Sequence, residues 1–206
     1  MNRLLQIRGC VEELGRSLRR HDHAAQLVEF AVALPLLVVF VVGIFDFSSA
    51  FTLKLKLTNL ARNAARVAAA GPISDVQPGS TPVSVMDAFY VIDNYLQANA
   101  INDCSVSSTP TGAGVTWTFI GTGSGCPAAG LTIVVNRGYY FPAIGATIPA
   151  INCASLSPNG ATAVIATCVS IQYPYPWKFG RAASLLGNNA ALPSQISTVA
   201  IALNEN

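Results

Sequence analysis

The sequence has few charged residues, and this shortage limits the class of protein it can be. Charged residues make up 11% of the 206 residues, whereas about a quarter is usual in soluble domains. Hydrophobic residues make up 51%, so the chain is neither disordered nor typical of a cytosolic enzyme. No Lys- or Arg-rich stretch alternates with aromatic residues, which argues against nucleic-acid binding. Part of the apolar surface therefore requires lipid or an assembly.

Histidine is also scarce, and both copies, His21 and His23, lie near the N-terminus. The rest of the chain therefore lacks the residue on which Ser-His-Asp catalysis, Cys-His catalysis and most zinc sites depend. The sequence contains no C-x-x-C motif, and the glycine-rich loop around Gly123 is not followed by a phosphate-binding Lys. We expect no catalytic activity, no cofactor, no metal and no small-molecule substrate.

A long apolar run, Phe30–Phe45, contains no charged residue. It extends from Ala24 to Phe51 if Glu29 and Asp46 are tolerated, which is enough for a spanning helix of about 20 residues. Arginines precede the run, so the positive-inside rule places the N-terminus in the cytoplasm and the C-terminus outside. The alternative, a secretory signal peptide, has an apolar region of about 7–15 residues before an A-x-A-like site. This run is longer and no such site follows its end.

The apolar run continues into a segment with helical periodicity. Its apolar residues are spaced by three and four, and Ala-rich NAARVAAA favours a helix. Gly71 and Pro72 should end it. A single helix over Ala25–Ala70 would be about twice as long as a bilayer requires, so we expect half of it to emerge from the membrane and to pack against another surface. The predicted apolar stripe consists of Leu53, Leu57, Leu60, Ala64 and Val67.

Beyond residue 70 the pattern predicts an extracytoplasmic domain over residues 71–206. Residues 71–82 are rich in Pro, Gly and Ser and indicate a linker. An amphipathic helix is predicted at Val85–Ala100, and short β-type runs follow between turns. The fold class is α+β: a long N-terminal transmembrane helix over residues 25–70, preceded by a basic leader over 1–24, and a small domain with an antiparallel sheet and one or two helices. The predicted strands are Val115–Ile120, Leu131–Asn136, Ala163–Tyr173 and Ile196–Leu203.

Four of the five cysteines lie in this outer domain, and Cys10 lies in the leader. An even number of cysteines on the oxidising side of a membrane predicts two disulfides. Four cysteines allow three pairings, of which we favour the pairing of sequence neighbours. Zinc binding is the alternative, and it is disfavoured by the absence of histidine from this region. The favoured pairs are Cys104–Cys126 and Cys153–Cys168.

Glu29 is the residue with the strongest functional signal. A carboxylate within a membrane segment is costly and marks a functional site by default. The run AAQLVEFAVALPLLVVFVVGIFDF resembles the N-terminal segment of type IV pilin-like proteins, and in particular the TadE-like family of tight-adherence (Flp-type) pilus systems. In that family a basic leader precedes a cleavage point, the fifth residue after the cut is Glu followed by Phe or Tyr, and a Pro lies within the apolar helix. Glu29, Phe30 and Pro35 fit this pattern.

The resemblance implies that a prepilin peptidase cuts between Ala24 and Ala25, although the family usually has Gly before the cut. It also implies that Glu29 pairs with the new α-amine of a neighbouring subunit, and that Pro35 loosens the helix for subunit assembly. The downstream segment to Ala70 is also similar to the family, and the closing segment Val169–Asn206 is weakly similar.

As a function, the resemblance implies a minor pilin-like (pseudopilin) component of a tight-adherence pilus that acts in pilus assembly, initiation or cell adhesion. Its expected partners are the membrane, the major pilin, a second minor pilin, the prepilin peptidase and the inner-membrane platform of the pilus machine. The expected location is the bacterial inner membrane, as a single-pass protein with a periplasmic or extracellular domain, or incorporated in a pilus.

Two alternatives remain open. One is a single-pass, membrane-anchored binding module that the peptidase does not process, and the other is a tethered envelope enzyme, which the missing histidines disfavour. For the binding module, aromatic residues of the outer domain could line a recognition face or could instead pack within the strands. These are Tyr139, Tyr140, Phe141, Tyr173, Tyr175 and Trp177.

Overall fold

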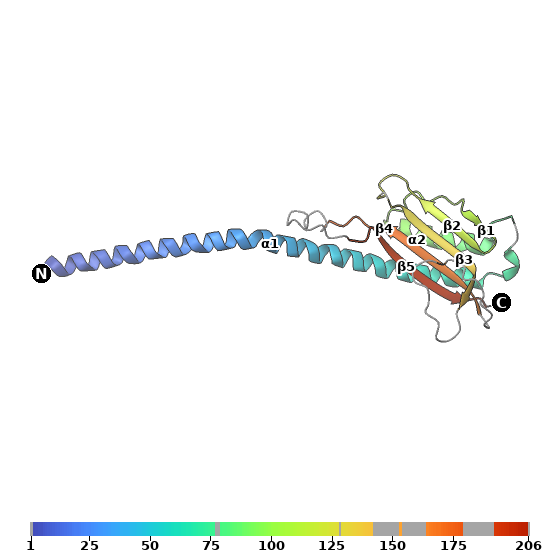
Figure 1. Cartoon of the computed structure of the whole chain (residues 1–206), viewed down its shortest axis with the longest axis horizontal. Coiled ribbons are helices and arrows are strands. Elements are labelled where there is room, and N and C mark those ends of the chain that lie inside the picture. Colours follow the sequence, from blue (N-terminus) through green and yellow to red (C-terminus); the bar gives the residue numbers. More distant parts are fainter. Residues whose placement is uncertain are drawn as a thin grey trace. The chain divides into compact units, whose positions relative to one another are not determined.

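The structure, a computed structural model, describes residues 2–76, 79–127, 129–141, 153, 164–178 and 192–205. Contacts divide the chain after Asp46. The first unit contains the beginning of the long helix α1, up to Asp46. The second, which we call the sheet unit, contains Phe47–Trp177 and Ala191–Asn206 and holds the rest of α1 together with every strand (Figure 1).

Helix α1 is continuous from Asn2 to Ala70. The leader that the sequence set apart as residues 1–24 therefore belongs to the same helix as the apolar segment. The sequence grouped residues 25–70 together, whereas contacts assign Phe47–Ala70 to the sheet unit. The helix ends where the sequence predicts, because the Gly71 amide donates to the carbonyl of Ala68 at 3.3 Å and Pro72 follows.

The buried face of α1 differs in one position from the predicted stripe. Leu57, Leu60 and Ala64 are buried as expected, but Val67 is 40% exposed and its neighbour Ala68 is fully buried. The buried positions recur at intervals of three, four and seven, which is the spacing of one helical face. Small residues dominate this face, and they share one core cluster with residues of α2 and the sheet. The fully buried alanines are Ala61, Ala64, Ala65 and Ala68.

The linker and the second helix also agree with the sequence in outline. The short 3-10 helix η1, Ile73–Asp75, lies in the Pro- and Gly-rich stretch where no element was predicted. Helix α2 extends over Val83–Ala98, two residues earlier at each end than predicted. It buries the expected apolar face, and its Phe89 ring stacks on Phe119 of the sheet with centroids 4.4 Å apart.

The sheet has five antiparallel strands in the order β1-β2-β3-β4-β5. The four predicted strands are present as β2, β3, β4 and β5, so the α+β class is confirmed. The first strand was not predicted, because it is three residues long, contains Gly112 and is exposed along its whole length. The strands are β1 Thr111–Ala113, β2 Thr116–Gly121, β3 Leu131–Phe141, β4 Val164–Pro174 and β5 Gln195–Leu203.

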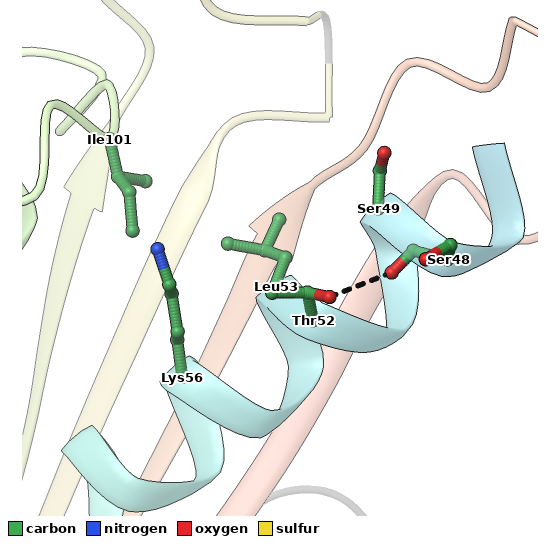
Figure 2. A pocket seen from close by; sticks show the side chains of 6 residues that line it. All are labelled: Ser48, Ser49, Thr52, Leu53, Lys56 and Ile101. Atoms are coloured by element: carbon green, nitrogen blue, oxygen red, sulfur yellow. Dashed lines mark hydrogen bonds between the residues drawn. The ribbon is translucent and has the colours of Figure 1, made fainter. Parts of the chain in front are cut away.

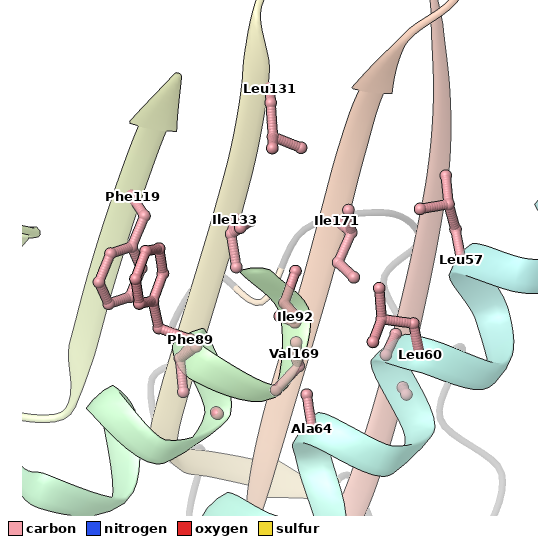
Figure 3. Close-up of a cluster of buried hydrophobic side chains, with 14 of the residues drawn as sticks. Leu57, Leu60, Ala64, Phe89, Ile92, Phe119, Leu131, Ile133, Val169 and Ile171 are labelled. Atoms are coloured by element: carbon pink, nitrogen blue, oxygen red, sulfur yellow. The ribbon is translucent and has the colours of Figure 1, made fainter. Parts of the chain in front are cut away.

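The main core lies between one face of the sheet and the two helices (Figure 3). Alternation along a strand sends every second side chain to this face. Ile133 of β3 and Ile171 of β4 are paired in register and are both fully buried. They meet Leu60 of α1 and Ile92 of α2 in one continuous cluster.

The two disulfides predicted by the sequence are present, with the pairing of sequence neighbours that it favoured. Cys104–Cys126 joins the loop after α2 to the turn after β2 and belongs to the main core. Cys168 alternates with core residues along β4, so the Cys153–Cys168 bridge lies on the opposite face and packs with Tyr139. Loops of this length contribute about 3 kcal/mol each to stability.

A buried arginine ties the end of α1 to the sheet. The Arg137 side chain is 1% exposed, and its Nη2 donates to the carbonyls of Gly71 at 2.8 Å and Pro72 at 3.3 Å. The same atom lies 4.0 Å from Asp75 Oδ1, and Asp75 Oδ2 accepts from the Ser84 amide at 2.9 Å. Burial lowers the pKa of the Arg137 guanidinium from its usual value, and Asp75 opposes that shift. One side chain thus joins β3 to the end of α1 and, through Asp75, to the start of α2.

Replacing Arg137 with methionine should lower the free energy of unfolding of the sheet unit by about 3–5 kcal/mol, because Asp75 loses its ion-pair partner and two carbonyls lose their donor. Urea unfolding of the full chain in detergent, followed by tryptophan fluorescence, measures the change. Arg62→Met is the control, since Arg62 is an exposed arginine of α1, and it should cost less than about 1 kcal/mol. Equal losses in the two variants would contradict this role for Arg137.

Candidate functional site

The first unit presents an apolar helix surface rather than a cavity. The side chains of α1 from Leu27 to Val38 are exposed on every side of the helix, whereas Val39 and Val42 are half-buried and Gly43 is buried. A helix that is apolar all round needs lipid or other helices around it. Within the described residues, one segment, Ala25–Ala70, is long and apolar enough to cross a membrane, which suggests membrane anchoring. The most exposed side chains are Leu27, Val28, Val32, Ile44 and Phe45.

The predicted processing residues lie close together on this helix. Ala24, Ala25, Glu29 and Phe30 fall within about two helical turns. Glu29 lies one turn after Ala25 on the same side of the helix. Both are exposed, as is Phe30, whereas the side chain of Ala24 is outside the described residues. An α-amine at Ala25 and the carboxylate of Glu29 would therefore face the same surroundings.

Glu29 stands alone among apolar neighbours. It is the only charged residue between Ala25 and Phe45. Within the described part of the chain it forms no hydrogen bond or ion pair. An ionised carboxylate in a hydrocarbon environment is costly unless a cation or hydrogen-bond donor meets it. This helix therefore requires a partner for Glu29 from outside the described residues.

Pro35 lies inside α1, and the helix continues through it. Proline has no amide hydrogen, so the carbonyl of Ala31, four residues earlier, lacks its usual donor. The proline ring also crowds that carbonyl, which weakens the helix locally. The apolar segment therefore has one built-in weak turn, six residues after Glu29.

At Phe47 the character of the helix surface changes, and a groove lies beside it. The groove has a volume of about 210 Å³. The ring of Phe47 packs on Trp177 with centroids 5.3 Å apart, and Tyr175 meets Trp177 edge-on at 4.8 Å. Trp177 Nε1 donates to the Pro193 carbonyl at 2.6 Å, which fixes the indole. We call this the aromatic groove, and it is lined by Phe47, Ala50, Phe51, Lys54, Trp177, Pro193, Gln195 and Ile196.

A second hollow of about 330 Å³ lies on another side of the same turns of α1 (Figure 2). Its lining is more polar. Thr52 Oγ1 donates to the Ser48 carbonyl at 2.9 Å, and the Lys56 side chain extends toward Ile101. We call it the hydroxyl pocket, and it is lined by Ser48, Ser49, Thr52, Leu53, Lys56 and Ile101.

The aromatic residues singled out by the sequence do not form one exposed face. Tyr139 is 2% exposed and Tyr173 is 8% exposed, so both pack inside the sheet unit. The Tyr173 hydroxyl donates to the Asn102 carbonyl at 2.9 Å, and burial, with Asp103 nearby, raises its pKa. Burial also raises the pKa of Tyr139. The side chains of Tyr140 and Phe141 are outside the described residues. Of the four whose side chains are described, Tyr175 and Trp177 belong to a partly exposed cluster.

Sequence reasoning missed the partner of that cluster, Phe47, which lies 130 positions from Trp177. The aromatic pair in YPYPW after a strand was the available signal, but nothing local connects it to α1. In the described part of the chain, no three His, Cys, Asp or Glu residues converge as metal ligands. The backbone of His21 and His23 lies in α1, and their side chains are outside the described residues.

In comparison with known proteins, one family model matches part of this chain. Residues 24–66 match the family model described as TadE-like protein. The match begins at Ala24, includes Glu29 and Pro35, and ends in the part of α1 that packs on the sheet. The resemblance of this segment to TadE-like proteins is confirmed, and it associates the chain with tight-adherence pili. No curated protein matches the chain, and no solved structure does.

Replacing Pro35 with alanine should strengthen the weak turn, because the new amide can donate to the Ala31 carbonyl. Proline costs about 3 kcal/mol in a helix interior, so amide hydrogens around residues 31–39 should exchange at least about tenfold more slowly in the variant. Hydrogen-exchange mass spectrometry of the full chain in detergent measures this. Leu36→Ala changes a neighbouring exposed side chain without adding a donor and should leave exchange unchanged. Equal exchange in Pro35→Ala and the parent chain would show that the missing hydrogen bond to the Ala31 carbonyl does not weaken this turn.

Proposed function

We propose that the chain is a minor pilin-like (pseudopilin) component of a tight-adherence pilus system, which acts in assembly, initiation or adhesion and has no catalytic activity. One observation carries the proposal. The segment that matches TadE-like proteins contains two carboxylates, Glu29 and Asp46, and Glu29 has no partner within the described residues and lies on an exposed apolar helix. Such a residue supports assembly with other chains rather than chemistry within this one.

In this proposal α1 crosses the bacterial inner membrane, with the leader in the cytoplasm and the sheet unit in the periplasm or outside the cell. The partners are the major pilin, a second minor pilin, the prepilin peptidase and the inner-membrane platform of the pilus machine. Apolar side chains over residues 27–38 are exposed all round the helix, so lipid and neighbouring helices could cover the same surface in turn.

Processing supplies the missing partner charge. Hydrolysis of the Ala24–Ala25 peptide bond consumes one water and leaves a carboxylate on Ala24 and an α-amine on Ala25. The mature helix then begins with a cation one turn before Glu29. If the Glu29 of one subunit pairs with the amine of its neighbour, the two helices are held at one axial offset. A pair of this kind satisfies both charges, which neither helix can do in lipid alone.

The pair matters because the apolar surface does not discriminate between lipid and protein. Moving α1 from lipid into a helix bundle exchanges one apolar environment for another, so there is little hydrophobic driving force between the helices. Close packing and polar contacts must then decide the association. Glu29 is the only charged residue in this stretch able to do so.

The first test is the mature N-terminus. Expressed with an active prepilin peptidase, the chain should be shortened to begin at Ala25, as measured by intact mass and N-terminal sequencing. With an inactivated peptidase it should remain full length. Ala24→Gly should be cut at least as completely, because the family usually has glycine before the cut, and a bulky Ala24→Glu variant should resist cutting. A full-length chain under both conditions would falsify the processing step and leave a permanent single-pass anchor.

The second test concerns Glu29 after cleavage. Glu29→Gln keeps the size of the side chain and removes its charge, so the α-amine of a neighbour would be left unpaired at a cost of several kcal/mol. The variant should still be cut at Ala25, but the amount recovered with sheared pili should fall about tenfold or more. Glu13→Gln alters a leader carboxylate that processing removes, and it serves as the matched control. Normal recovery of cleaved Glu29→Gln with pili would exclude the pairing role.

A further inference from the structure

The length of the apolar segment fixes where a bilayer would end on this helix. Counting about 20 residues, the number a spanning helix needs, from Phe30 reaches Ser49. The aromatic groove and the hydroxyl pocket both involve α1 residues from Phe47 to Lys56. The two hollows therefore lie at the level where hydrocarbon gives way to lipid headgroups on the outer side.

The aromatic side chains at this level are of the types that are common at membrane–water interfaces. Trp and Tyr are enriched where the headgroups begin, because a ring suits the apolar side and a polar edge suits the wet side. Tyr175 and Trp177 reach this level from the segment after β4 and are held there by the ring contact with Phe47 and by Pro193. Phe47 and Phe51 remain 51% and 66% exposed, so apolar surface is left for a partner.

Two lysines stand just beyond these rings. Lys54 lines the aromatic groove and Lys56 lines the hydroxyl pocket, so each hollow has a cation on its side away from the apolar run. A lysine can lay its alkyl stem along apolar surface while its ammonium group reaches the headgroup layer. There it meets phosphate, and a basic residue near an anionic lipid surface is worth about 1 kcal/mol.

We infer that Phe47–Lys56, Tyr175 and Trp177 form a collar that seats in the outer headgroup layer of the membrane. The glycerol and the upper acyl chain of a phospholipid occupy the aromatic groove. The lipid phosphate lies against Lys54 at the end of that groove. The occupant is a phospholipid because the groove is bordered by the exposed rings of Phe47 and Phe51 and ends at Lys54, whose charge complements a phosphate.

This inference rests on membrane anchoring by α1 and not on the proposed role in a pilus. It requires neither cleavage at Ala24 nor any other pilus protein. It also assigns the sheet unit a position on the membrane surface, which the resemblance of residues 24–66 does not address.

The depth of Trp177 in a bilayer tests the inference. The sequence has two tryptophans, and Trp117 is 7% exposed in the sheet unit. The full chain is reconstituted in vesicles of phosphatidylethanolamine and phosphatidylglycerol that carry bromine either at the upper acyl carbons or near the chain ends. Trp177→Phe reports Trp117 alone, and subtracting its emission from that of the parent chain isolates Trp177. Trp117→Phe, where it folds, gives the same signal directly.

Trp177 should lose most of its emission with bromine at the upper acyl carbons and less with bromine near the chain ends. The emission of Trp117 should be unaffected by either lipid. Quenching of Trp177 by iodide in the water, with none by brominated lipid, would overturn the inference. Protection of Trp177 from both quenchers would also overturn it, since another protein surface, such as a second copy of this chain, would then cover the groove.

Charge reversal tests the phosphate contact. Lys54→Glu should reduce the lipid quenching of Trp177 in vesicles that contain phosphatidylglycerol, because a carboxylate repels the lipid phosphate. Arg66→Glu reverses an exposed cation further along α1 and should leave the quenching unchanged. Inorganic phosphate added to the water should have no effect on either chain. If Lys54→Glu and Arg66→Glu behave alike, Lys54 does not hold the lipid.

Discussion

The sheet unit depends on the packing of α1 into the same core as α2 and the sheet. Alanines line much of the buried face of the helix. At the helix end the contact with α2 is tight, because a Cβ on Gly71 would lie 2.6 Å from the Cβ of Ser84. Arg137 then fixes that end by binding the carbonyls of Gly71 and Pro72. Phe47–Ala70 is therefore part of the packed core of the sheet unit and not a linker that leads to it.

Local pattern predicted most of the fold, because most elements have a clear period and clear stops. Helix α2 and four strands follow from the spacing of apolar residues, and Gly71 with Pro72 marks the end of α1. The alternating spacing of four and three placed Val67 on the predicted stripe, three residues after Ala64. The structure buries Ala68 instead, which lies four residues after Ala64 on the same face. A strand of three exposed residues carries too little pattern to be predicted.

The candidate sites were predictable only where neighbouring residues in sequence carry them. Glu29, Phe30 and Pro35 lie within two turns, so one short motif contains them. Arg137 and the aromatic groove each depend on pairs more than 60 positions apart. No single sequence shows that Trp177 meets Phe47 or that Arg137 reaches Gly71. The aromatic residues illustrate the same limit: Tyr173 and Tyr175 are two positions apart, yet only the first is buried within the sheet unit.

The few charges in this chain show how its two units differ. Arg137 is buried and finds partners, Asp75 and two carbonyls, inside the sheet unit. Glu29, in the first unit, has no partner among the described residues. On the proposed function, transfer of α1 from lipid to a bundle changes little in apolar burial. The pairing of Glu29 then favours the bundle, whereas contacts of Lys54 and Trp177 with lipid favour the membrane. The balance of these two opposing interactions, one near each end of the apolar run, would decide whether the subunit stays at the membrane or leaves it.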